Sequence, residues 1–179
     1  MEVVKQYNLV ARCLHWLSAI AVLGLFGLGW WMVELDYYSP WYQDAPTIHR
    51  SVGILLAGVT VLRLVWNQVS QKPAVEGRPF ERKAAISAHH LMYVLLFGLF
   101  ITGYLISTEK GQGIEVFNWF TVPALGELFD GQADLSGTIH YYCAYSLIGL
   151  VVIHAGAAIK HHVIDKDNTL RKMTTGVKS

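Results

Sequence analysis

Charged side chains are scarce in this chain of 179 residues, since Lys, Arg, Asp and Glu together make up only 15% of it. Three stretches, 13–33, 84–108 and 135–159, contain none of them. Each is long enough to cross a hydrocarbon layer roughly 30 Å thick as an α-helix. A fourth, shorter stretch over residues 50–66 is interrupted only by Arg63 near one end. The scarcity of charge therefore predicts four transmembrane helices.

Other familiar signatures are missing. The sequence has no internal repeat, no low-complexity tract, no nucleotide-binding loop and no hydrolytic triad, so nothing in it indicates a nucleotide-dependent or hydrolytic enzyme. Its only cysteines, Cys13 and Cys143, fall near opposite ends of their predicted helices, too far apart for the roughly 7 Å that a disulfide allows between Cα atoms. We expect one all-α domain over residues 1–179, an integral membrane four-helix bundle with helices at about 10–34, 47–68, 84–107 and 137–163.

The basic residues predict how this bundle lies in the membrane. The first apolar segment is longer than the apolar core of a signal peptide, so we expect it to remain as a helix. Only Arg50 and Lys110 fall on the side of the first and third connections. The other 12 of the 14 basic residues share the opposite side, namely Lys5, Arg12, Arg63, Lys72, Arg78, Arg82, Lys83, Lys160, Lys166, Arg171, Lys172 and Lys178. Both termini are therefore predicted to be cytoplasmic.

Histidines stand out in the apolar segments. His140 and His154 are 14 residues apart in the last one, which is almost four helical turns, so they project from nearly the same face about 21 Å apart. His15 lies at the depth of His154, and His49 at the depth of His140. Each could simply be a hydrogen-bonded interior residue, but four imidazoles at two matching depths favour metal ligation. The pattern predicts two haem irons, held by the pairs His15/His154 and His49/His140.

The mode of haem attachment follows from another absence. The chain has no C-x-x-C-H motif, so any haem is bound without thioether links, as a b-type haem. With two histidines on each iron, no coordination position stays open. We therefore expect electron transfer rather than oxygen activation.

Three motifs strengthen this interpretation: His15-Trp16, the H-R-S-V-G of residues 49–53, and His140…His154…His161-His162 followed by D-K-D-N-T-L at 165–170. Together they resemble the bacterial cytochrome b561 family over essentially the whole chain. The resemblance implies a four-helix cytochrome of the bacterial inner membrane with two b haems, exchanging electrons with a quinone pool. It also implies that His15, His49, His140 and His154 are the axial ligands, in agreement with the pairing by depth.

Four further residues are candidates with alternative interpretations. His161 continues the ligand-bearing face of the last helix and could hydrogen-bond a ubiquinone carbonyl and deliver a proton, or be a solvated interfacial histidine. His89 is either a substitute inner ligand or a neighbour of the inner haem edge or the quinone. Arg50 and Arg63 could bind haem propionates as planar forks, or extend their side chains to the membrane surface.

The expected function is transmembrane electron transfer between an outer one-electron donor and the ubiquinone pool. The resemblance adds a specific activity, superoxide:ubiquinone oxidoreductase, in which superoxide is oxidised outside the membrane. One alternative is a haem-containing membrane anchor that relays electrons for a redox protein; another is a haem-free proton or metal transporter. Lipid is an expected partner and nucleic acid is not.

The connection over residues 109–137 is too long and too aromatic for a simple turn. We expect its aromatic residues to form a short amphipathic segment across the outer mouth of the bundle, as a candidate lid over the outer haem.

Overall fold

The computed structural model describes residues 6–175, in which four helices are long and apolar enough to cross a membrane. They are α1 (Leu9–Met32), α2 (Asp44–Val69), α3 (Pro79–Thr108) and α4 (Gln132–Val163). A small hairpin of β1 (Ile114–Val116) and β2 (Phe120–Val122) follows α3, and a short helix α5 (Thr169–Met173) follows α4. The chain is thus a mostly helical four-helix membrane bundle, as predicted. Lys5 and Lys178, counted in the charge argument, lie outside the described residues.

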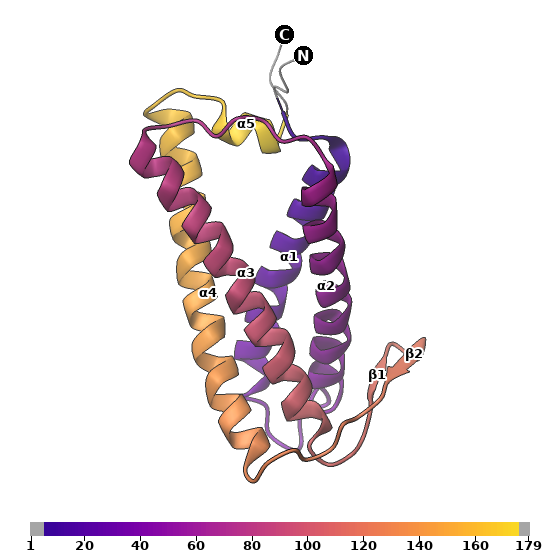
Figure 1. The fold of residues 1–179 in the computed structure, drawn as a ribbon. Coiled ribbons are helices and arrows are strands. Elements are labelled where there is room, and N and C mark those ends of the chain that lie inside the picture. Colours follow the sequence, from indigo (N-terminus) through magenta and orange to yellow (C-terminus); the bar gives the residue numbers. More distant parts are fainter. Residues whose placement is uncertain (1–5, 176–179) are drawn as a thin grey trace.

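The helices run alternately up and down, so the bundle has two distinct ends (Figure 1). We call the end with the start of α1, the 70–78 connection and α5 the terminal end, and the opposite end, with the two strands, the hairpin end. Packing is closest within two pairs, α1 with α2 and α3 with α4, and much sparser between α1 and α4. Small hydroxyl side chains fill the interior by bonding their own helix, as when Ser18 and Thr60 donate to Leu14 O and Leu56 O.

The helices extend beyond the charge-free stretches that predicted them. Helix α3 begins at Pro79 rather than 84, because Glu81 accepts a hydrogen bond from the Arg78 backbone at 2.8 Å and closes a capping box. Helix α4 begins at Gln132 rather than 137, where the buried Gln132 amide donates to Leu105 O and Glu109 accepts from Ala133 N. Charge marks where hydrocarbon ends, whereas capping groups in the more polar layer decide where a helix ends.

The connection after α3 differs from the expectation of a single amphipathic segment. It forms the antiparallel hairpin β1–β2, paired from Ile114↔Val122 to Val116↔Phe120. Gly113 permits this pairing, since a Cβ there would lie 2.7 Å from Val122 O. Ile114 and Val116 are buried while Glu115 between them is exposed, which is the alternation of a strand with one covered face. The hairpin packs beside α2, so the predicted lid is wrong for this segment.

Candidate functional site

Near the hairpin end, His49 of α2 faces His140 of α4. Their ring centres are 6.2 Å apart and their planes are inclined by 63°. His49 lies in the second turn of α2 and His140 in the third turn of α4, and the two rings meet at one depth. The structure therefore brings together the first predicted pair.

Thr102 of α3 determines which nitrogen of His140 is available. The Thr102 hydroxyl lies 2.7 Å from Gly98 O and 3.0 Å from His140 Nδ1. A hydroxyl has one hydrogen, and when Thr102 donates it to Gly98 O it must accept from the N–H of His140. The proton is then on Nδ1, and Nε2 keeps the lone pair that a metal needs.

Two glycines let the helix backbones approach these rings. A Cβ at Gly29 of α1 would lie 3.2 Å from His49 Cε1, and a Cβ at Gly103 of α3 would lie 3.3 Å from His140 Cε1. A larger residue at Gly29 or Gly103 would therefore displace the ring of His49 or His140. Within residues 6–175, the buried Nδ1 of His49 has no hydrogen-bond partner. Buried polar atoms in proteins are usually hydrogen-bonded, so this nitrogen is an exception.

Toward the terminal end, His15 of α1 faces His154 of α4 with 6.3 Å between ring centres and 65° between planes. A third ring, His89 of α3, lies closer to His154, at 5.2 Å. Arg63 Nη2 is 2.9 Å from His15 Nδ1. A guanidinium can only donate, so in this arrangement a neutral His15 carries its own proton on Nε2. This contact has to be released before Nε2 of His15 can bind a metal.

The separations distinguish the candidate pairs. Metal–imidazole bonds are about 2.0 Å long, so two imidazoles on opposite sides of one metal have ring centres about 6 Å apart. The separations of 6.2 and 6.3 Å match this arrangement. The separation of 5.2 Å for His89 is shorter than it requires, which leaves His89 as a neighbour of His154.

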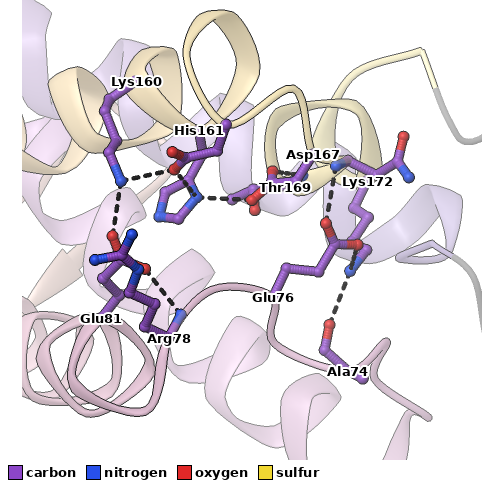
Figure 2. Close-up of polar contacts among 11 residues, drawn as sticks. Ala74, Glu76, Arg78, Glu81, Lys160, His161, Asp167, Thr169 and Lys172 are labelled. Carbon is purple, nitrogen blue, oxygen red and sulfur yellow. Dashed lines mark hydrogen bonds and ion pairs between the residues drawn. The ribbon is translucent and has the colours of Figure 1, made fainter.

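A cluster of charged residues joins α3, α4 and the C-terminal segment at the terminal end (Figure 2). Lys160 Nζ lies 2.7 Å from Glu81 and 2.6 Å from Asp165. His161 Nδ1 lies 2.7 Å from Asp167 and 3.0 Å from Asp165, so its ring is held by two carboxylates. Its Nε2 is left for another partner.

Asp167 is itself held by hydrogen bonds. Its Oδ1 accepts from the backbone N–H of Thr169 at 2.8 Å. Burial acts to raise the pKa of Asp167, but the bonds from Thr169 and His161 outweigh burial and lower it below the usual 3.8.

A second ion pair fastens α5 over the 70–78 connection. Lys172, only 9% exposed, pairs with Glu76 and donates to Ala74 O at 2.8 Å. The backbone N–H of Asn168 donates to the same Glu76. Residues 165–170 carry the family resemblance in the sequence, but the sequence does not show these ion pairs. The i,i+4 spacing of His161 and Asp165 could have indicated one of these contacts, whereas Glu76 and Glu81 come from a distant part of the chain.

The two arginines fall in different surroundings. Arg63 lies beside the His15 pair and above the Tyr93 ring, 5.6 Å from its centre. Arg50 is exposed and donates to Pro46 O and Thr47 Oγ1 of its own helix. Arg63 is thus placed next to a histidine pair, and Arg50 at the surface of the hairpin end.

Comparison with known proteins identifies this arrangement. The model of the prokaryotic cytochrome b561 family matches residues 6–176. The chain belongs to this family. Cytochrome b561 homolog 2 of Escherichia coli K12 is 46% identical over 94% of this chain and 91% of its own length. The probable superoxide oxidase CybB of Yersinia pestis is 27% identical over 94% and 96%, and cytochrome b561 homolog 1 of E. coli K12 is 26% identical over 89% and 92%.

Members of the cytochrome b561 family are membrane electron-transfer proteins that bind b-type haem. The histidines described above fit such a group in three respects. The ring separations suit two axial ligands, Thr102 leaves Nε2 of His140 with its lone pair, and the glycines allow close approach of the backbone.

Proposed function

We propose that this cytochrome b561 binds two haems, one between His49 and His140 and one between His15 and His154, and moves electrons between them across the membrane. The observation that carries the proposal is the two histidine pairs, 6.2 and 6.3 Å between ring centres, that share α4. When bound, the haems supply one-electron redox chemistry. Because two histidines would hold each haem, no coordination position would stay open for oxygen, which favours electron transfer over oxygen activation.

The proposed location is the bacterial inner membrane, with the terminal end in the cytoplasm. Lysines and arginines concentrate at the terminal end, including Arg78, Lys160, Arg171 and Lys172, which supports this orientation. A reporter fused to the C-terminus should be active only as a cytoplasmic reporter. A periplasmic signal would reverse the orientation.

Ubiquinone is the proposed acceptor at the terminal end, close to His161 and bordered by His89. Nδ1 of His161 contacts the carboxylates of Asp165 and Asp167. Nε2 is therefore the atom that can carry a proton and donate a hydrogen bond to a quinone carbonyl. Protons for the reduced quinone then come from the cytoplasmic side. His89 lies beside His154, at the depth of the ligand pair.

The proposed donor acts at the hairpin end, and superoxide is the first candidate. The relative from Y. pestis named a probable superoxide oxidase supports this choice. Superoxide is a small anion, and the exposed Arg50 places a positive charge at this end. A redox protein that donates electrons there is the second candidate.

Turnover by the purified full-length protein tests both partners. With a superoxide-generating system and a soluble ubiquinone, the haem bands should become reduced and ubiquinol should form. His161→Asn should lower the quinone rate at least several-fold with haem spectra unchanged, and His162→Asn is the matched control. An unchanged rate in His161→Asn would place the quinone elsewhere. Reduction by quinol but not by superoxide would reject superoxide, and a protein without haem bands would favour the transporter alternative.

A further inference from the structure

The hairpin β1–β2 is held firmly against α2 at its base. The Ser51 hydroxyl, fully buried, donates to Glu115 O at 3.3 Å and accepts from Phe117 N at 3.3 Å. Ser51 is seven residues into α2, about 10 Å along the axis from its start. Figure 1 shows the hairpin beside the first turns of α2, at their level and to one side of the bundle. It therefore lies next to the helix and does not cap the end of the bundle.

The turn of this hairpin has a strained backbone. Phe117 and Asn118 have φ of 45° and 58°, and Trp119 N donates to Val116 O at 2.8 Å to close the turn. These are the φ signs of a type I′ turn, which asparagine or glycine adopts readily. A phenylalanine there is an outlier whose strain persists only where another interaction compensates for it.

The strained turn displays aromatic rings outward. Trp119 is 71% exposed, Phe117 38% and Phe120 48%. The Phe117 and Trp119 rings lie 5.7 Å apart and form one apolar surface. Residues 116–122 contain no charged side chain, and Asn118 is the one amide among them. A cluster of large rings without a charged group suits the boundary between lipid head groups and acyl chains.

This surface continues a belt of aromatic residues at the same end. Trp30 at the end of α1 is 65% exposed, and Trp41, just before α2, is 48% exposed and packs on Trp31 with ring centres 6.0 Å apart. The hairpin contacts α2 at Ser51, seven residues after the helix begins. The tip is thus beside a transmembrane helix at the depth where tryptophan gathers in membrane proteins.

We propose that the hairpin at residues 114–122 is a lipid-binding anchor, whose tip of Phe117, Asn118 and Trp119 inserts into the head-group region at the hairpin end. Burial of the rings in lipid offsets the strain of the turn. Through Ser51 the anchor holds the first turns of α2 at a fixed depth, and His49 lies two residues away from that contact.

Spin labels in the full-length protein test the depth of the tip. In a Cys13→Ser/Cys143→Ser background, one variant carries Asn118→Cys and a matched control carries Asp130→Cys, an exposed position in the same connection. Both are placed in bilayer discs of phosphatidylethanolamine and phosphatidylglycerol. Relative to a water-soluble nickel chelate, oxygen should reach the label at 118 several-fold better than the label at 130. Equal access of the chelate to both positions would overturn the proposal.

The same measurement distinguishes lipid from protein. A label at 118 that neither oxygen nor the chelate reaches would mean that a second copy of the chain covers the tip, which also overturns the proposal. A second variant, Trp119→Phe, leaves the turn residues Phe117 and Asn118 unaltered. Brominated acyl chains quench the fluorescence of tryptophans that they reach, so this variant should lose part of the lipid-dependent quenching. Unchanged quenching would place Trp119 outside the bilayer.

Discussion

At the scale of single residues, the hydroxyl of Thr102 fixes the tautomer and the orientation of His140. Its oxygen accepts a hydrogen bond from Nδ1–H of His140 and so leaves Nε2 as the metal-binding nitrogen. Without this bond the imidazole would be free to rotate or to exchange tautomers. The same role is absent at His49, whose Nδ1 has no partner within residues 6–175.

Thr102→Val should weaken haem binding at the His49/His140 pair, because the valine cannot accept the hydrogen bond. Loss of such a partner typically costs about 10- to 100-fold in metal affinity. The measurement is the rate of haem transfer to an apoglobin, with Thr102→Ser as the rescue. Ser107→Ala, which removes a hydroxyl that donates to Gly103 O in the same helix, is the control. Equal transfer rates in all variants would contradict the role of Thr102.

Arg63 should set the reduction potential at the His15/His154 pair. Its guanidinium lies beside His15. Once the hydrogen bond to Nδ1 is released for metal binding, the nearby positive charge would still destabilise the more positive, oxidised iron. Arg63→Gln should therefore lower the potential of that haem by on the order of tens of millivolts, whereas Arg63→Lys should change it less. Redox titration followed by optical spectra measures both haems at once. A shift of equal size at the other haem would mean that Arg63 acts through the fold and not through its charge.

At the scale of elements, the C-terminal segment is fastened by charges. Residues 165–173 are joined to α4 through His161 and Asp167, and to the 70–78 connection through Lys172 and Glu76. These contacts hold the C-terminal segment beside His161, where the quinone is proposed to bind.

The contribution of Asp167 predicts a pH dependence. Its folded pKa is lowered from 3.8, so its stabilisation is fully present above that value and is lost as pH falls through the lower folded pKa. Asp167→Asn should therefore lower the thermal midpoint near pH 6, and the gap from the natural protein should shrink toward pH 3. Melting followed by circular dichroism over this range provides the test. A gap that stays constant with pH would show that the carboxylate charge is not involved.

The four long helices could be predicted from the sequence because hydrophobic length is a local property. Their ends could not, since Pro79 and Gln132 depend on capping contacts such as Arg78 with Glu81. The hairpin was missed for a similar reason. Positive φ at Phe117 belongs to the turn of the hairpin, and the lack of room beside Gly113 comes from Thr121 and Val122 of the paired strand. An aromatic-rich sequence does not reveal either feature.

The histidine pairs could be predicted because spacing along one helix fixes both depth and face. The positions of Thr102, Gly29 and Gly103 depend on how neighbouring helices are rotated, which spacing does not reveal. The contact of Arg63 with His15, and the carboxylates around His161, likewise join segments far apart in the chain.

At the scale of the whole molecule, the bundle consists of two closely packed helix pairs, and both histidine contacts cross between the pairs. Helix α4 supplies one histidine to each, and α1 and α2, from the other pair, supply the partners. Because direct packing between α1 and α4 is sparse, bound haems would contribute much of the attachment between the pairs.

Haem content of the protein and two single variants tests this account most directly. The purified protein should contain two low-spin haems per chain. His140→Ala should lose the haem at the His49/His140 pair and keep the spectrum of the other haem. His154→Ala should lose the haem at the His15/His154 pair and keep the spectrum of the haem at His49/His140. His162→Ala, outside both pairs, should keep both haems and so controls for misfolding. One haem per chain, a high-spin resting spectrum, or loss of the same haem in both ligand variants would contradict the account.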